Sequence, residues 1–156
     1  MPSTTHDNEE YGFAAPRGRV YDSVLNVVGG TPLVALPRIM QEDKLKSRVL
    51  LKLEFFNPLG SVKDRIGTAM VLDAERKGKI VPGRTLLVEP TSGNTGISLA
   101  FVAAARGYRL IVTMPEGASI ERRRMVRLMD AQVELSPARL GMAGAIARAN
   151  EILAET

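Results

Sequence analysis

The sequence predicts an α/β fold: an open, mainly parallel β-sheet between layers of helices, in a three-layer αβα arrangement. From residue 48 onward, short apolar runs alternate with amphipathic or alanine-rich runs of ten or more residues. Turns that contain glycine or proline separate several of these runs. Strands that alternate with helices of this length are joined by right-handed crossovers, which makes neighbouring strands parallel. Four strand–helix units fit into residues 48–156.

The chain before this region has a different character. Residues 1–18 are rich in polar residues, glycine and proline, so we expect a disordered tail. Residues 20–28 predict one or two helical turns, and residues 29–32 (GGTP) predict a turn. A short extended piece at 33–36 and a charged loop or helical turn at 41–47 follow.

The remaining elements follow from periodicity and from helix end signals. The expected strands are residues 49–56, 85–88, 108–113 and 131–135. The expected helices are residues 62–78, 95–106, 119–129 and 141–154. Gly78 and Gly107 are expected to end helices, because glycine readily adopts the left-handed conformation found there. The Ser119 side chain is expected to cap the N-terminus of the third helix.

Composition excludes several classes of protein. The chain has 156 residues, of which 45% are hydrophobic and 24% charged, as in one ordinary globular domain. It has no cysteine, and therefore no disulfide framework and no thiolate metal site; we expect no metal. No apolar run reaches membrane-spanning length, and residues 1–19 lack the apolar core of a signal peptide. We therefore expect a cytoplasmic protein without membrane contact.

A basic cluster raises the question of nucleic-acid binding. The formal net charge is +4, and Arg122, Arg123, Arg124 and Arg127 lie in one short run. Aromatic residues, on which bases would stack, make up only 4% of the chain. A solvated helix face is therefore the favoured interpretation of this cluster, and we expect no nucleic-acid partner.

Lys63 is the first candidate for chemistry. It lies in the run NPLGSVKDR at residues 57–65, which follows an expected strand and opens an expected helix. The partial positive charge at a helix N-terminus disfavours an ammonium and favours the neutral, nucleophilic amine. This setting predicts a Schiff-base lysine. For a single lysine considered alone, a solvated surface position is the commoner case, and a second motif changes that balance.

The second motif is the run EPTSGNTG at residues 89–96. It supplies three hydroxyl groups, one amide and flexible backbone N–H groups directly before a helix. Such a loop is a nest for a carboxylate or phosphate, although taken alone it is more often a capped helix start. It lacks the Gly-Lys-Ser/Thr ending of a nucleotide-binding P-loop. Both motifs follow expected strands, and parallel sheets bind ligands beyond the carboxyl ends of their strands.

Together, the two motifs resemble those of pyridoxal-phosphate enzymes of fold type II, the tryptophan synthase β-like fold. Later runs are similar to the cysteine synthase (O-acetylserine sulfhydrylase) family: residues 114–116 (MPE), 120–123 (IERR) and 141–146 (GMAGAI). Cystathionine β-synthase is similar through the first two motifs and less so around residue 141. The resemblance covers about residue 18 to the end of the chain.

The resemblance implies a role for each motif. Lys63 is expected to bind pyridoxal 5'-phosphate covalently and to move the substrate α-proton. Asn94 is expected to hydrogen-bond the ring hydroxyl of the cofactor. Thr91, Ser92, Asn94 and Thr95 are expected to hold the substrate α-carboxylate. The implied reaction is a transferase β-replacement, in which O-acetylserine and sulfide give cysteine and acetate.

The resemblance also bears on partners. It implies that the full-length enzyme is a homodimer, and it raises serine acetyltransferase as a candidate partner. The sequence decides neither that partner nor the choice between sulfide and thiosulfate as sulfur donor.

The chain also departs from the family pattern. Gly30 stands where the family usually has asparagine, and Asp130 stands where glycine is usual, directly before a strand. If residue 130 needs a positive φ, aspartate tolerates it at some cost. Family members are considerably longer. Their glycine/threonine-rich phosphate loop lies in the additional part, and no GTGGT run occurs in this chain.

We therefore expect the N-terminal half of such an enzyme. Residues 48–156 would form the small domain that carries the lysine and the carboxylate loop, and residues 19–47 would lead in from the larger domain. Apolar surface on residues 20–36 would then be exposed and promote self-association. The chain alone is expected to have little or no activity. The alternative is a non-catalytic remnant, a binding or regulatory fragment of such an enzyme.

Overall fold

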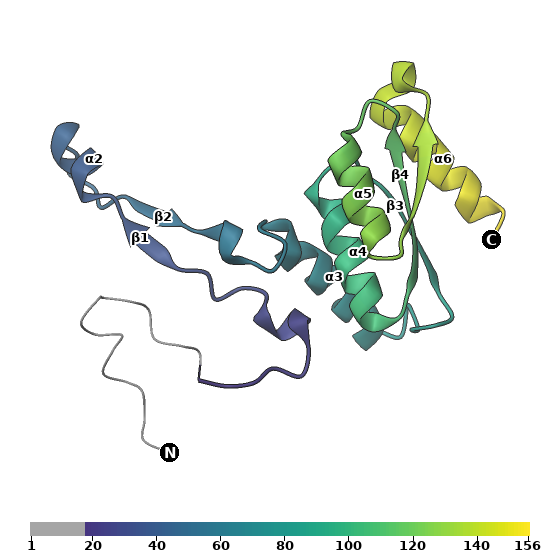
Figure 1. Cartoon of the computed structure of the whole chain (residues 1–156), viewed down its shortest axis with the longest axis horizontal. Coiled ribbons are helices and arrows are strands. Elements are labelled where there is room, and N and C mark those ends of the chain that lie inside the picture. Colours follow the sequence, from purple (N-terminus) through teal and green to yellow (C-terminus); the bar gives the residue numbers. More distant parts are fainter. Residues whose placement is uncertain (1–17) are drawn as a thin grey trace.

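The computed structural model describes residues 18–156, which form an N-terminal arm (residues 18–56) and an α/β body (residues 57–156) (Figure 1). The tail expected over residues 1–18 lies, apart from Gly18, outside the described residues. The body contains a three-stranded sheet of β3 (Leu86–Pro90), β4 (Arg109–Pro115) and β5 (Gln132–Ser136) in the order β3-β4-β5. Both pairings are parallel, which confirms the predicted mainly parallel sheet.

Helices cover both faces of this sheet. α4 (Asn94–Arg106) and α5 (Ile120–Leu128) pack on one face, and α6 (Gly141–Ala154) packs on the other (Figure 1). α3 (Lys63–Arg76) packs against α4. The three-layer αβα arrangement predicted from the sequence is therefore confirmed for the body. A short 3-10 helix, η3 (Ala138–Leu140), leads into α6.

Side chains along β4 alternate between the two faces of the sheet, so this strand contacts the helices on both sides. Leu110, Val112 and Met114 are buried in one cluster with residues of α4 and α5. Thr113 points to the opposite face, where its buried hydroxyl donates a hydrogen bond to the Ala145 carbonyl of α6 at 2.8 Å. Successive side chains of a strand face opposite sides, so one strand serves both layers.

The predicted helix end signals operate as expected. The Ser119 hydroxyl accepts a hydrogen bond from the Arg122 backbone N–H at 3.4 Å and caps α5. Gly107 ends α4 in the left-handed region at φ 76°, where its N–H bonds the Ala103 carbonyl. The short distance in sequence between these partners explains why local sequence sufficed to predict them.

The structure corrects the prediction that residues 49–56 form a strand of the parallel sheet. β2 (Leu50–Lys52) does not join the parallel sheet; it pairs antiparallel with β1 (Leu33–Ala35) in a separate two-stranded sheet. The rest of the run forms a 3-10 helix, η2 (Glu54–Phe56). An apolar run of strand character needs only a free edge as partner, and residues 33–35 supply one close in sequence. The parallel sheet therefore holds three of the four expected units.

The rest of the arm agrees with the sequence in part. A single helical turn, η1 (Val24–Val27), lies within the expected segment, and Ser23 accepts a hydrogen bond from Leu25 N at 3.2 Å. Residues 43–47 form a loop, which was one of the two alternatives expected for residues 41–47. The helical turn lies earlier, as α2 (Pro37–Glu42), because Pro37 suits the first helical position. Within residues 18–156, none of the helices combines the length and apolar character needed to cross a membrane.

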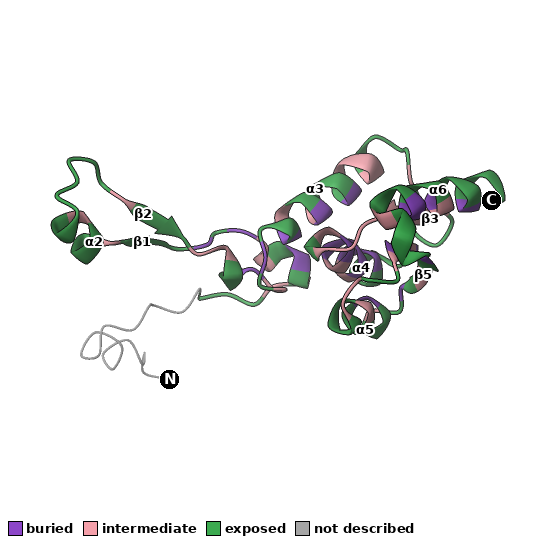
Figure 2. Cartoon of the chain, turned by 90° about the horizontal axis from the view of Figure 1, so that it is seen from above, coloured by how far each residue is buried: buried purple, intermediate pink, exposed green. Residues whose placement is uncertain are grey.

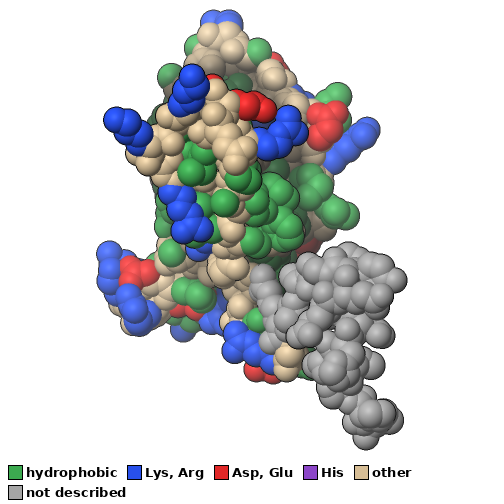
Figure 3. Space-filling view, turned by 90° about the vertical axis from the view of Figure 1, so that its left-hand side faces the viewer, with side chains coloured by type: hydrophobic (Ala, Val, Ile, Leu, Met, Phe, Trp, Pro, Cys, Tyr) green, Lys and Arg blue, Asp and Glu red, His purple; other side chains and the backbone are tan. Residues whose placement is uncertain are grey.

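The arm exposes much of its apolar surface, as expected for residues 20–36 (Figures 2 and 3). Val20 is 96% exposed and Leu33 is 59% exposed, and Phe55 at the base of the arm is 64% exposed. Phe55 lies 5.0 Å from Phe56, ring centroid to centroid, and Phe56 is also exposed. Apolar side chains gathered in this way favour association with another surface. Self-association of the chain stays a prediction.

Asp130 has a φ of 62°, so the position that the sequence singled out does adopt the left-handed conformation. Gly30 likewise has a positive φ of 58°, a conformation that asparagine also tolerates.

Replacing Asp130 by glycine should relieve backbone strain and raise the free energy of unfolding by about 0.5–1 kcal/mol. Denaturant titration measures this change. The control is Asp43→Gly, because Asp43 has an ordinary φ of −90° and should gain nothing. Equal effects of the two substitutions would refute the strain argument.

Candidate active site

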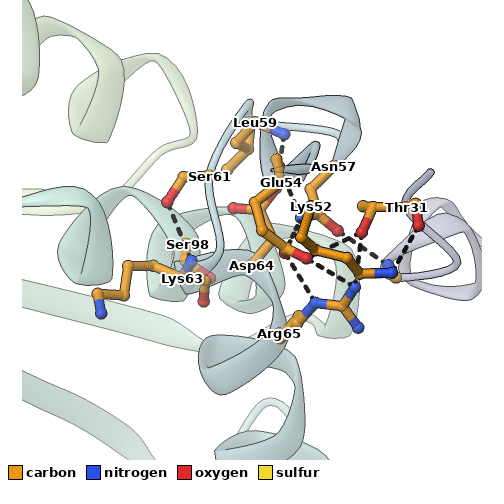
Figure 4. A network of polar contacts seen from close by, with 11 residues as sticks. Thr31, Lys52, Glu54, Asn57, Leu59, Ser61, Lys63, Asp64, Arg65 and Ser98 are labelled. Atoms are coloured by element: carbon orange, nitrogen blue, oxygen red, sulfur yellow. Dashed lines mark hydrogen bonds and ion pairs between the residues drawn. The ribbon is translucent and has the colours of Figure 1, made fainter. Parts of the chain in front are cut away.

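A polar network joins the base of the arm to the start of α3 (Figure 4). Arg65 Nε donates to Glu54 Oε2 at 2.8 Å, and Arg65 Nη2 donates to Glu54 Oε1 at 3.0 Å. The Thr31 hydroxyl donates to Glu54 Oε1 at 2.8 Å. The paired geometry of guanidinium and carboxylate fixes the orientation of both groups. The turn at residues 29–32 is therefore held against the helix that carries Lys63.

Asn57, the first residue of the lysine motif, extends this network. Its side-chain oxygen accepts the Gly29 N–H at 2.9 Å, and its amide donates to the carbonyl and to Oε2 of Glu54, both at 2.8 Å. The side chain is buried, so these bonds satisfy polar atoms that water does not reach. The Gly29 backbone lies close to the Arg65 side chain, since a Cβ at residue 29 would lie 3.0 Å from Arg65 Nη1.

Acid should weaken this network. The hydrogen bond from Arg65, followed in importance by those from Thr31 and Asn57, lowers the pKa of Glu54 from 4.5 to about 2. The network's contribution to stability is therefore fully present above pH 4.5 and is lost as the pH falls toward 2. We expect Glu54→Gln to be less stable than the wild type at neutral pH, with a gap that narrows across this window. Thermal melts at stepped pH measure the gap; a gap that does not depend on pH would contradict the prediction.

The loop before Lys63 is folded onto the start of α3. Asp64 Oδ2 accepts the Leu59 N–H at 2.7 Å, and Ser61 Oγ accepts the Lys63 N–H at 3.0 Å. Asp64 is fully buried, and this burial raises the pKa of its carboxyl group. The two bonds fix the tight turn through Gly60, which has a φ of 71°. Lys63 is therefore the first residue of α3, as the sequence predicted.

The Lys63 side chain is free for chemistry. It is exposed, and its amine has no hydrogen bond or ion pair with any residue in the described part of the chain. In Figure 4 it extends away from the Glu54 network. An amine that is accessible and unpaired is available to an aldehyde.

The carboxylate loop lies at the start of α4. The Thr91 N–H bonds the Thr113 carbonyl at 3.0 Å, and the Thr91 hydroxyl accepts the Gly93 N–H at 3.3 Å. Among residues 18–156, no acceptor faces the backbone N–H groups of Ser92, Asn94 and Thr95. Three free N–H groups at a helix N-terminus suit an anion. The geometry therefore supports the anion nest predicted from the sequence.

Arg122 supports the loop at the start of α4, a role that the sequence did not predict. Its Nη1 donates to the Ser92 carbonyl at 3.2 Å, so α5 supports the loop that starts α4. The sequence signalled only a basic cluster, which is the solvated face of α5 for the exposed Arg124 and Arg127. Nothing local in the sequence distinguishes Arg122 from these neighbours.

The lysine motif and the loop at the start of α4 lie close together, although the lysine motif does not follow a strand of the parallel sheet as expected. Instead, α3 packs on α4, and the Ser98 hydroxyl of α4 donates to the Lys63 carbonyl at 2.8 Å. Ser98 lies one helical turn after Asn94. Helix pairing, rather than strand order, brings the lysine to the carboxylate loop.

Gly96 is required for the shape of this loop. A Cβ at this buried position would lie 2.7 Å from Thr91 Cγ2 and 3.2 Å from Val112 Cγ1. Gly96→Ala should therefore lower the free energy of unfolding by about 1–3 kcal/mol, the usual cost of overpacking. Gly93→Ala is the control, since Gly93 has a φ of −123° and no atom within 4 Å of its Cβ position. Chemical denaturation of both variants tests the prediction, which fails if they lose the same stability.

Comparison with known proteins identifies the family. Residues 24–156 match the family described as pyridoxal-phosphate dependent enzyme. The chain belongs to this family. Family members use pyridoxal phosphate, so the cofactor expected from the two motifs is the cofactor of the family.

Individual relatives agree with the resemblance seen in the sequence. Cysteine synthase from Staphylococcus aureus (strain Mu50 / ATCC 700699) is 50% identical over 134 residues, which are 86% of this chain and 42% of that protein. The crystal structure of cysteine synthase (OASS) from Entamoeba histolytica has a TM-score of 0.86 and 41% identity, and the match covers 92% of this chain and 43% of that one. The fold type II architecture is thereby confirmed.

A third relative is named for a different activity. The crystal structure of O-ureido-L-serine synthase has a TM-score of 0.80 and 44% identity, over 88% of this chain and 42% of that one. The present chain thus spans less than half the length of the relatives that it matches. The expectation that it corresponds to the N-terminal portion of such an enzyme is confirmed.

Proposed function

We propose that this chain carries the lysine-bearing part of a cysteine synthase, which converts O-acetylserine and sulfide to cysteine and acetate. The observation that carries the proposal is the free amine of Lys63 at the start of α3, which packs against α4 and its N-terminal loop with free backbone N–H groups. The 50% identity to a cysteine synthase supports this choice of reaction. Cysteine biosynthesis in the cytoplasm is the corresponding cellular role.

The residues present fit the cofactor and the substrate. Lys63 offers an exposed, unpaired amine for covalent attachment of pyridoxal phosphate, and Asn94 is exposed at the first position of α4, where its amide could hydrogen-bond the ring hydroxyl. When bound, the cofactor withdraws electrons from the substrate α-carbon. Lys63 takes the proton from that carbon and later returns it. Thr91, Ser92, Asn94 and Thr95 orient the substrate through its α-carboxylate.

We also propose how the arm is used. Residues 19–47 would lead in from the larger domain found in longer relatives, and residues 48–156 would form the small domain. β2 pairs with β1 across this boundary, so β2 would accompany residues 19–47. The exposed Leu33 and Phe55 offer apolar contact for such a domain. A homodimer and a serine acetyltransferase complex are further proposals that follow from the same family.

The second candidate is a non-catalytic remnant of such an enzyme, a fragment that binds ligands without turnover or has a regulatory role. The same remnant role applies if the ancestry is closer to cystathionine β-synthase. The observation that favours the remnant is that no GTGGT run occurs in the 156 residues, so we expect low turnover.

The test of the proposal is a visible absorbance titration. The purified chain is mixed with pyridoxal phosphate, then with O-acetylserine, then with sulfide, and cysteine is assayed at the end. We expect a Schiff-base band that shifts with O-acetylserine, and a turnover far below that of the Staphylococcus aureus enzyme. A shift without cysteine supports the binding fragment. The absence of any band would contradict both candidates.

A further inference from the structure

We propose that Ser98 and Gly67 are a positioning pair that sets Lys63 against the loop at the start of α4. The pair lies at the contact between α3 and α4, and no motif of the sequence marked either residue. The inference rests on the proposed function in one respect, namely that Lys63 is the residue to be positioned.

The pair lies one helical turn after Lys63 on α3 and one helical turn after Asn94 on α4. Gly67 follows Lys63 by four residues on α3, and Ser98 follows Asn94 by four residues on α4. Residues four apart lie on the same face of a helix, about 6 Å along its axis. The contact between Gly67 and Ser98 therefore supports the same faces that carry Lys63 and Asn94.

The hydrogen bond fixes the backbone of the lysine itself. Ser98 is fully buried, and its hydroxyl donates to the Lys63 carbonyl at 2.8 Å. In a helix this carbonyl also accepts the N–H four residues later, and its two lone pairs allow both bonds. The first turn of a helix commonly frays. A bond from a neighbouring helix holds Lys63 in place at that weak point.

The absence of a side chain at Gly67 sets how closely the helices approach. A Cβ at this position would lie 2.1 Å from Ser98 Oγ, 3.0 Å from Ser98 Cβ and 3.2 Å from the Ser98 carbonyl carbon. The first contact disappears if the hydroxyl is removed, but the other two involve atoms that cannot rotate away. An alanine at residue 67 must therefore push α3 away from α4 and carry Lys63 with it.

The chain offers a matched control for the hydrogen bond. Thr113 also has a fully buried hydroxyl that donates to a helix carbonyl at 2.8 Å, in this case that of Ala145 on the opposite side of the sheet. Thr113→Val and Ser98→Ala remove the same kind of side-chain bond, and Thr113→Val keeps the backbone carbonyl that accepts the Thr91 N–H. Only Ser98 contacts the lysine of the site.

The first experiment measures reaction at Lys63. The wild type, Ser98→Ala and Thr113→Val are treated with pyridoxal phosphate and reduced with borohydride, and peptide mapping gives the share of label on Lys63 relative to Lys77 and Lys79. We expect similar falls in melting temperature for both variants and a severalfold lower Lys63 share for Ser98→Ala alone. If both folded variants keep the wild-type share, Ser98 is only structural and the proposal is overturned.

The second experiment measures helix spacing without cofactor. The chain has no cysteine, so cysteines at the exposed positions Ala69 and Ala105 can carry a pair of spin labels. We expect a longer distance in Gly67→Ala and the wild-type distance in the double variant Gly67→Ala/Ser98→Gly, which moves the missing Cβ to the other helix. If Gly67→Ala fails to fold, recovery of folding by the double variant supports the proposal.

The outcomes separate this proposal from the proposed function. An unchanged spin-label distance in folded Gly67→Ala overturns the positioning pair, whatever the labelling shows. A wild type that labels Lys63 no more than Lys77 contradicts the proposed function, while the distances still decide whether the pair sets the spacing of α3 and α4.

Discussion

Replacing Lys63 by alanine is expected to abolish site-specific attachment of pyridoxal phosphate to this chain. A Schiff base forms on an accessible primary amine, and the Lys63 amine is exposed and unpaired at the start of α3, which packs against α4. Borohydride reduction followed by peptide mapping should find the label on Lys63 in the wild type. In Lys63→Ala, the visible Schiff-base band should be lost and only scattered label on other lysines should remain.

Lys46→Ala provides the matched control for this loss. Lys46 is exposed on the arm, outside both motifs, so its replacement should leave the band unchanged. Neither substitution should alter the melting temperature, because both side chains lie in solvent. A band that survives in Lys63→Ala, or label spread evenly over all lysines in the wild type, would remove Lys63 from the proposed site.

Asn94→Ala should weaken binding of O-acetylserine to the cofactor-loaded chain by about tenfold to a hundredfold. Hydrogen bonds to charged groups contribute roughly 1.5–3 kcal/mol each, and about 1.4 kcal/mol corresponds to a factor of ten. Spectral titration of the Schiff-base band with O-acetylserine gives the dissociation constants of the wild type and the variant.

The control for Asn94 is Asn150→Ala. Asn150 is also an exposed helical asparagine, but it lies on α6, on the far side of the sheet from α4. Its replacement should leave the titration unchanged. Because Asn94 is exposed, its own replacement should affect binding and not folding. Identical titration curves for wild type and Asn94→Ala would exclude the residue from the carboxylate site.

Much of the body could be predicted because its determinants are local. The strands at 85–88, 108–113 and 131–135 and the helices between them were predicted from periodicity, and the structure has them with small shifts at their ends. The Ser119 cap and the Gly107 stop each involve partners within four residues. A departure from the family pattern marked residue 130 as a position that could need a positive φ, and Asp130 has one in the structure.

The arm was predicted less well because pairing is not a local property. Residues 49–56 have the apolar character of a buried strand, yet β2 lies in a two-stranded sheet with both Leu50 and Leu51 exposed. Composition indicates that a segment can form a strand; it does not indicate which edge the strand will join. For this reason the sequence predicted four strands in the parallel sheet, whereas the structure has three.

The sequence by itself determined the chemistry of the candidate site: a lysine at a helix start, and a loop of hydroxyls and free N–H groups at another. Tertiary structure alone decided how these parts are placed. The Ser98 bond to Lys63 joins residues 35 apart in sequence, and the Arg65 bond to Thr31 joins residues 34 apart. Arg122 reaches Ser92 over 30 residues. Chemical character belongs to each residue, whereas distances of this kind depend on how the whole chain packs.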